Sequence, residues 1–210
     1  MRTHTFLMPI PAALALALAA CGGGADNANS GDNAAAEADR AAETTAATPP
    51  AAAPAPDTMA AATAMAALQP TAGNQTAGEL RFAVVNGRIE VTGTVTGLPA
   101  GGTHGFHVHE TGDCSAPDGS SAGGHFNPGA TEHGRVGQGA HHAGDSDNIT
   151  AGTDGTAQVS GWLEGATIGG GGADDIVGKG VIVHKDADDY ATQPTGNAGD
   201  RLACGVIQAG

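Results

Sequence analysis

The sequence predicts an all-β fold, either a sandwich or a barrel of roughly 150 residues. Glycine accounts for 35 of the 210 residues, and short runs of β-branched and apolar residues alternate with turn signals. No long stretch shows the periodicity of an amphipathic helix. A domain of that size is large enough to bury one hydrophobic core.

The first expected element is a β-hairpin. A run of strand-forming residues at 79–85 is followed by Asn86-Gly87 and then by a second run at 88–95. Because Asn and Gly both tolerate positive φ, this pair predicts a tight turn between two antiparallel strands.

Later in the chain, a second hairpin is expected to join residues 148–151 to residues 158–163 through a turn at Asp154-Gly155. Further short apolar runs predict strands at 104–110, 176–184 and 202–208. Two long segments separate these strands, at 111–147 and 185–200. Loops of that length are usually functional or disordered, and we expect both to carry function.

The N-terminal segment has the pattern of an export signal. Arg2 precedes an apolar run from Phe6 to Ala20 that is too short to cross a bilayer with its flanks. The run ends in Leu18-Ala19-Ala20-Cys21, which resembles a bacterial lipoprotein lipobox. The resemblance implies a signal peptide at residues 1–20, cleavage before Cys21 and a lipid attached to that cysteine. An ordinary secretory peptide with a chance cysteine is the alternative.

Residues 22–58 contain no Val, Ile, Leu, Phe, Tyr or Trp, so they cannot bury a core. Together with a lipidated Cys21 they are expected to form a disordered tether, residues 21–58, with a reach of roughly 30–35 Å. A frayed helix within the alanine-rich stretch 32–47 is the alternative. The folded domain is expected at residues 59–210.

The chain is acidic, with 22 Asp and Glu against 8 Lys and Arg. This balance argues against nucleic acid as a partner and against electrostatic attraction to anionic lipid. Contact with a membrane is therefore expected through the N-terminal lipid. The cysteine count fits export as well, since lipidation of Cys21 leaves Cys114 and Cys204, which an oxidising compartment would let bridge.

Eight of the nine histidines lie within residues 104–184, which indicates a site. Successive side chains of a strand point to opposite faces, so His107 and His109 share one face while Phe106 and Val108 share the other. The histidine face can offer two imidazoles to one metal ion, and the other face can enter a core. Imidazole nitrogen suits copper, and imidazole with carboxylate suits tetrahedral zinc. The further ligand candidates are His125, His133, His141, His142, Asp145 and His184.

Two segments resemble the two signatures of copper/zinc superoxide dismutases. The first is residues 105–114, Gly-Phe-His-Val-His-Glu-Thr-Gly-Asp-Cys, and the second is residues 196–207, Gly-Asn-Ala-Gly-Asp-Arg-Leu-Ala-Cys-Gly-Val-Ile. Residues 124–128 and Val183-His184 fall where that family places its other copper ligands. Two independent motifs with matching ligand spacing make the resemblance specific. It covers about residues 60–210 and, with the lipobox, points to a bacterial lipoprotein form of the family.

The resemblance implies a Greek-key β-sandwich or flattened barrel of immunoglobulin-like architecture with two long functional loops. It implies copper bound by His107, His109, His125 and His184. It implies zinc bound by His125, His133, His142 and Asp145, with His125 bridging the two ions as an imidazolate.

Other family features are matched residue by residue. Asp188 resembles the outer carboxylate that links a copper-ligand histidine to a zinc-ligand histidine, a role that fixes ring orientation. Arg201 resembles the arginine that receives the anionic substrate beside the copper. Cys114 and Cys204 resemble the intrachain disulfide of the family.

Some assignments keep an alternative. His141 neighbours His142 and could replace it, although the family spacing favours His142. Asp189 could exchange roles with Asp188. His104 is expected to be a structural hydrogen-bonding residue rather than a ligand.

One departure from animal family members concerns attraction of the substrate. Those proteins have lysines on the loop before the second signature, whereas residues 190–200 here contain no Lys or Arg. Attraction is therefore expected to come from the metals and Arg201, with Lys185 or Lys179 as further contributors.

The implied activity is dismutation of superoxide to dioxygen and hydrogen peroxide outside the cytoplasm, at the periplasmic face of the cell envelope. His125 and Arg201 are the expected catalytic residues, because His125 supplies a proton and Arg201 positions the anion. The alternatives are a lipid-anchored copper-binding or copper-delivery protein without turnover, and a degenerate member kept as a structural module. The complete ligand set favours the enzyme. A homodimer is one possible assembly of this chain.

Overall fold

The computed structural model describes residues 62–210. The expected signal peptide, the lipidation site Cys21 and the expected tether lie outside the described residues, as does the start of the expected domain. Within the described part of the chain, no helix is long and apolar enough to cross a membrane.

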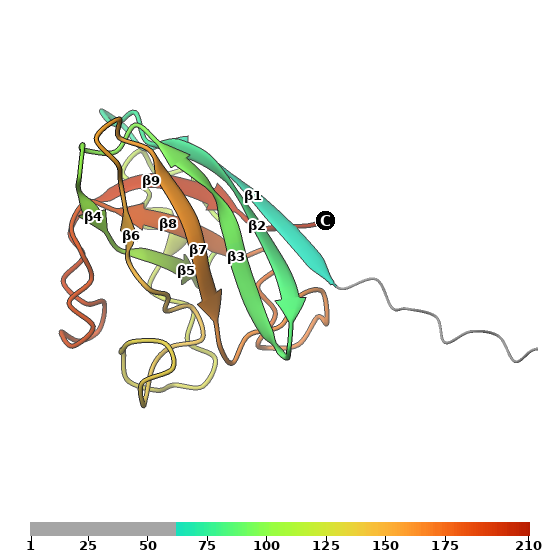
Figure 1. The fold of residues 1–210 in the computed structure, drawn as a ribbon. Coiled ribbons are helices and arrows are strands. Elements are labelled where there is room, and N and C mark those ends of the chain that lie inside the picture. Colours follow the sequence, from blue (N-terminus) through green and yellow to red (C-terminus); the bar gives the residue numbers. More distant parts are fainter. Residues whose placement is uncertain (1–61) are drawn as a thin grey trace, which may run out of the picture. The chain divides into compact units, whose positions relative to one another are not determined.

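The described residues form ten β-strands and one short 3-10 turn, η1 (Figure 1). The first strands are β1 (Thr63–Pro70), β2 (Ala77–Val85), β3 (Arg88–Thr96) and β4 (Thr103–His104). Next come β5 (Phe106–His109), η1 (Ser120–Ala122), β6 (Ile149–Thr150) and β7 (Ala157–Leu163). The last strands are β8 (Gly180–His184), β9 (Arg201–Val206) and β10 (Gln208–Ala209). The all-β fold class predicted from the sequence is confirmed.

Most strands belong to one curled antiparallel sheet in the order β5-β8-β9-β1-β2-β3-β7, with β10 beside β1. β1 joins the two halves of this sheet, because residues 63–68 pair with β2 whereas Gln69 and Pro70 pair with β9. The chain passes from β3 to β5 at the far edge, returns to place β7 beside β3, and crosses again to place β8 beside β5. These crossings give the Greek-key sandwich that the family resemblance implies.

The first predicted hairpin is confirmed. β2 and β3 pair along their whole length, and Val85 lies opposite Arg88. Between them, Asn86 has a φ of 51° and Gly87 a φ of 81°. Two successive positive φ values give the turn whose twist matches that of the flanking strands.

The second predicted hairpin is wrong in its pairing. Strands form near both expected places, but β6 pairs with β4 and β7 pairs with β3. β6 has two residues, so β7, with seven, forms a far longer ladder against β3. A turn still connects them, in which the Gly152 N–H donates to the Thr156 carbonyl oxygen.

The sequence analysis names no strand where β1 forms. Alanine favours helix, and this segment is rich in alanine. Its buried residues Ala64, Ala66 and Leu68 nevertheless alternate with more exposed ones, which is the period of a strand.

Three expected strands are shorter than predicted or divided. Residues 176–179 form a turn closed by a hydrogen bond from the Lys179 N–H to the Ile176 carbonyl oxygen, so the strand begins at Gly180. Gly105 divides the run at 104–110, since its N–H donates to Asp186 instead of continuing the ladder. The run at 202–208 divides at Ile207, whose N–H donates to the Lys179 carbonyl oxygen, so β9 ends at Val206 and β10 begins at Gln208.

The alternation predicted for β5 is confirmed. Phe106 and Val108 are buried in the main hydrophobic core together with residues such as Phe82 and Val181. His107 and His109 are equally buried, but they belong to a cluster of polar side chains. β5 therefore separates the core from the candidate site.

Both long loops are confirmed as connections without strands, and η1 is the sole regular element within them among the described residues. The disulfide between Cys114 and Cys204, which the resemblance implies, is present and ties the first long loop to β9. Both loops contact the histidines carried by β5 and β8: Gly123 of the first loop contacts His109, and Gly199 of the second loop contacts His184.

Candidate metal centre

Four histidines converge where β5, the end of β8 and the first long loop meet. His107 and His109 lie on β5, which pairs with β8, and His184 ends β8. His125 joins them through an isolated bridge to His109. One ligand atom from each lies within 4.8 Å of the others. These four residues are the first donor set.

Backbone carbonyl groups orient two of these rings. His109 Nδ1 lies 2.9 Å from the Gly123 carbonyl oxygen, and His184 Nδ1 lies 3.3 Å from the Gly199 carbonyl oxygen. A carbonyl oxygen can only accept, so both Nδ1 atoms carry the proton. The Nε2 atoms, which lie 3.3 Å apart, therefore present the lone pairs that a metal needs.

The second donor set is His125, His133, His142 and Asp145, which the first long loop brings together. Asp145 Oδ1 lies 2.8 Å from His125 Nδ1 and 3.3 Å from His142 Nδ1, and Oδ2 lies 3.0 Å from His133 Nδ1. The N–H groups of Gly134 and His142 donate to Oδ2 at 3.1 and 2.8 Å and hold the carboxylate. His125 belongs to both sets, because its Nδ1 faces Asp145 and its Nε2 remains for the first set.

Asp188 lies behind both donor sets. One carboxylate oxygen is 2.7 Å from His107 Nε2, and the other is 3.0 Å from His133 Nε2. Both rings therefore turn Nδ1 toward the site. Burial opposes the ionisation of Asp188, but its hydrogen bonds to the two histidines hold its pKa well below the usual range. Asp189 is exposed and accepts hydrogen bonds from Thr192 in the following turn, so the bridging position belongs to Asp188.

The unpaired atoms of the cluster fit metal ions. Four buried ring nitrogens make no hydrogen bond: Nδ1 of His107, Nε2 of His125, Nδ1 of His133 and Nδ1 of His142. The last two contact the Asp145 carboxylate as ion pairs only. A buried polar atom without a partner is costly, and a cation bound at its lone pair removes that cost. Four imidazoles suit copper, and three imidazoles with one carboxylate suit tetrahedral zinc.

Burial keeps three rings of the first set, those of His109, His125 and His184, neutral. Desolvation is the main cause that lowers the pKa of His109 and of His184 well below 6.5. It likewise lowers the pKa of His125 to about 4, against the opposing effect of Asp145. Protons therefore compete weakly with a metal at these three rings.

The second set has the opposite electrostatics. Burial works against protonation of His133, but its contacts with Asp145 and Asp188 outweigh burial and raise its pKa to about 9. Burial also opposes ionisation of Asp145, yet its close contacts with the rings of His125, His133 and His142 hold the pKa of Asp145 far below the usual range. Without metal, this set holds a proton close to the position that a cation would take.

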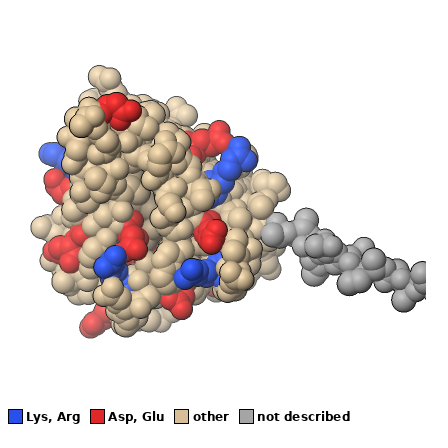
Figure 2. Space-filling view, in the orientation of Figure 1, with Lys and Arg blue, Asp and Glu red and all other residues tan. Residues whose placement is uncertain are grey.

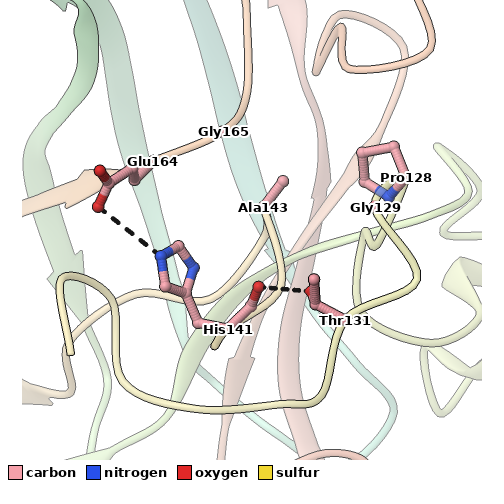
Figure 3. A pocket seen from close by; sticks show the side chains of 7 residues that line it. All are labelled: Pro128, Gly129, Thr131, His141, Ala143, Glu164 and Gly165. Carbon is pink, nitrogen blue, oxygen red and sulfur yellow. Dashed lines mark hydrogen bonds and ion pairs between the residues drawn. The ribbon is translucent and has the colours of Figure 1, made fainter. Parts of the chain in front are cut away.

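His141 lies outside both donor sets (Figure 3). Its Nδ1 is 2.9 Å from the His142 carbonyl oxygen, and its Nε2 is 3.7 Å from the Glu164 carboxylate. It lines a surface pocket together with Pro128 and Thr131. Of the two neighbouring histidines, His142 is the one that the structure brings into the second set.

Arg201 begins β9 directly opposite His184. Its guanidinium donates to the carbonyl oxygens of Gly119 and Gly123, at 2.7 and 2.6 Å. Both acceptors are neutral, so these contacts leave its charge uncancelled. The Gly123 carbonyl also holds His109 Nδ1, and the disulfide ties the loop that carries both carbonyls to the strand of Arg201.

The two lysines expected to assist Arg201 are both engaged elsewhere. Lys185 Nζ lies 3.4 Å from the Asp200 carboxylate, which offsets its charge. Lys179 Nζ stands 5.1 Å above the centre of the Phe126 ring. On the face drawn in Figure 2, the basic side chains lie apart from one another instead of forming a patch. Arg201 is thus the better-placed cation for an anion at the first set.

Sequence reasoning missed the amide side chains that hold the site. Asn148 accepts from the Asp188 N–H and donates to the Asp188 carbonyl oxygen, both at 2.9 Å. The Tyr190 hydroxyl accepts from the Asn148 N–H at 2.8 Å. No spacing pattern marks such contacts between distant loops. His104, by contrast, has the structural role expected of it, with Nδ1 3.0 Å from the His184 carbonyl oxygen.

Fold and geometry together define a β-sandwich protein with two adjoining sites suited to metal ions and one histidine common to both. Residues 76–207 match the family model described as copper/zinc superoxide dismutase. The match covers more than half of the chain, and the chain belongs to this family, as its two signatures predict.

Two solved structures show the same similarity. The clock protein EA4 is 36% identical, with a TM-score of 0.62, and the match covers 70% of this chain and 93% of that one. A mutant of an SOD-like protein from Bacillus subtilis is 35% identical, with a TM-score of 0.63 and coverage of 69% and 97%.

Proposed function

We propose that this chain dismutates superoxide to dioxygen and hydrogen peroxide, with copper bound by the first donor set and zinc by the second. The observation that carries the proposal is the shared ring of His125. Its Nδ1 lies 2.8 Å from Asp145, and its Nε2 is buried without a hydrogen-bond partner. A ring in this position can offer one nitrogen to each of two metal ions.

Copper, when bound, supplies the one-electron chemistry that no side chain here provides, and zinc supplies a fixed positive charge at His125 Nδ1. The chain itself supplies the remaining needs. Burial keeps His109 and His184 neutral, and Asp188 turns two further rings so that their Nδ1 atoms face the site.

His125 is the proposed proton donor. Its Nε2 lies among the ligand atoms of the first donor set and has no hydrogen-bond partner in the protein, so a proton placed there can pass to an anion bound beside that set. Nδ1 stays on the side of the second donor set throughout. The ring therefore keeps its orientation while Nε2 gains and loses the proton.

Arg201 is proposed to bind and orient the anion. Two carbonyl oxygens fix its guanidinium, and its strand position places it opposite His184. Superoxide carries one negative charge, so the attraction is electrostatic and weakens as ionic strength rises.

The alternative function is copper binding or copper delivery without turnover. The descriptions of the two solved neighbours, a clock protein and an SOD-like protein, do not themselves state turnover of superoxide. The two hypotheses differ in one measurable respect, since both predict bound copper but only the first predicts consumption of superoxide.

The test combines elemental analysis with superoxide consumption on the same metal-loaded sample. The proposal expects one copper and one zinc per chain and rapid consumption. Bound copper without consumption would favour the alternative, and a single metal per chain at saturation would contradict the shared site. Removal of the common ring by His125→Ala should weaken both metals together.

We also propose that the chain is exported and held at the periplasmic face by a lipid on Cys21. The disulfide between Cys114 and Cys204 supports an oxidising compartment. Mass spectrometry of the membrane fraction should find a mature chain that starts at Cys21 and carries the lipid mass. A Cys21→Ser form that was still processed and membrane-bound would exclude this anchor.

A further inference from the structure

The backbone of His133 is held by one side chain. The His133 N–H donates to Gln193 Oε1 at 2.9 Å, and Gln193 Nε2 donates to the His133 carbonyl oxygen at 2.8 Å. Across the described residues, no other hydrogen bond reaches either of these two backbone groups. His133 is 4% exposed, so loss of the Gln193 amide would leave a buried N–H and a buried carbonyl unpaired.

Gln193 is presented to His133 by a closed turn of the second long loop. The Gly196 N–H donates to the Thr192 carbonyl oxygen at 2.7 Å and closes the turn around Gln193. Gly196 packs so closely that an added Cβ would lie 2.7 Å from His133 Nε2. Asp188, four residues before Thr192 in the same loop, accepts at that same nitrogen. The second long loop therefore contacts both the ring and the backbone of His133.

We propose that Gln193 is a positioning residue of the second donor set, which holds the His133 peptide so that the ring presents Nδ1 beside Asp145 and His142. Two hydrogen bonds to one residue fix the direction of its peptide, as a pair does in an antiparallel ladder. Asp188 fixes the far side of the ring. The inference rests on the proposed role of the second set in zinc binding, and it is independent of turnover.

The deciding variant is Gln193→Leu, which removes both hydrogen bonds and keeps a side chain of similar size. We expect zinc to pass to a chelator about tenfold faster, at the low end of the ~10–100-fold typical for groups that orient ligands. Copper release should stay unchanged. Gln193→Glu keeps the acceptor for the His133 N–H but lacks the donor, so it should lie between the wild type and Gln193→Leu.

Two further measurements separate positioning from general stability. Cobalt(II) bound at the second set should show altered ligand-field bands in Gln193→Leu that Gln193→Glu partly restores. Hydrogen exchange at the His133 amide should accelerate in Gln193→Leu. Gln138→Leu is the matched control, because Gln138 is exposed on the same loop as His133, and it should leave all readouts unchanged.

The proposal is overturned if Gln193→Leu releases zinc within about twofold of Gln138→Leu with unchanged cobalt bands, even if its metal-free form melts earlier. In that case Gln193 serves the fold alone. If the wild type consumes no superoxide but zinc release responds to Gln193 as expected, the dismutase proposal fails and this one stands.

Discussion

The two donor sets differ in what holds them together. The first takes three of its four histidines from paired strands, and backbone carbonyls orient His109 and His184. The second lies on a loop without strands, and two carboxylates, Asp145 and Asp188, orient its rings. Burial makes His109 and His184 of the first set neutral, whereas His133 in the second set keeps a proton. We infer that sheet register preserves the first set without metal, while the second depends on its charges.

The largest expected effect comes from Asp145→Asn, which removes the charge at the centre of the second set. Asp145 contacts three histidines, so zinc affinity should fall by at least ~100-fold, more than for an outer partner. Copper affinity should change far less. Competition with chelators of known affinity measures both. Asp147→Asn is the control, since Asp147 pairs with Arg135 at the surface. Equal loss of both metals would show that the two sets are not separable.

A second prediction concerns the disulfide between Cys114 and Cys204, which ties the first long loop to β9 beside the first donor set. Cys114→Ser combined with Cys204→Ser should lower the free energy of unfolding by about 2–5 kcal/mol, as for native disulfides in exported domains. Metal retention should suffer more at the first set, because the bridge holds the loop that bears the Gly123 carbonyl. Thermal melting and metal release on the same variant test this. If the variant lost more zinc than copper, the disulfide would support the second donor set more than the first, which contradicts this prediction.

Arg201→Ala should leave both metals bound and lower the rate of superoxide consumption about ten- to a hundredfold at low ionic strength. The substitution removes a charge that neutral carbonyls hold beside the first set. The rate should then depend less on salt, and Arg201→Lys should recover part of it by restoring charge without the planar fork. Arg81→Ala, at an exposed ion pair with Glu79, is the control. An unchanged rate in Arg201→Ala would move the role to Lys185 or Lys179.

The sequence predicts those parts of the molecule that follow a local rule. Strand alternation places His107 and His109 on one buried face, and Asn86-Gly87 marks its hairpin. The loop ligands follow no periodicity, so His133 and His142 could be assigned through the family resemblance but not from spacing alone. β1 was missed because its alternating residues are mostly alanine, whose local preference is helical.

Contacts between the two long loops leave still less trace in the sequence. Asn148 and Gln193 bond to backbone groups 40 and 60 residues away. Such contacts depend on how the loops meet after the sheet has formed. The first donor set, carried mostly by strands, is therefore more predictable than the side chains that support the second set.

The smallest expected effect is the pH dependence of zinc binding. His133 has a pKa of about 9, above the ordinary 6.5, because Asp145 and Asp188 outweigh its burial. The resulting ion pairs stabilise the metal-free protein fully below about pH 6.5 and lose that contribution as pH rises through 9. Zinc must displace this proton, so its affinity should rise with pH, by about fivefold between pH 8 and 9.

Copper binding should show no matching rise, because the pKa values of His109, His125 and His184 are already low. Calorimetry in buffers of different ionisation enthalpy counts the protons released by each metal. Near pH 8, zinc should release about one proton more than copper does, since His133 is still protonated there. Equal proton release by the two metals would mean that the second set is not held together by its charges. The two sets would then differ only in that strands carry most of the first and a loop carries the second.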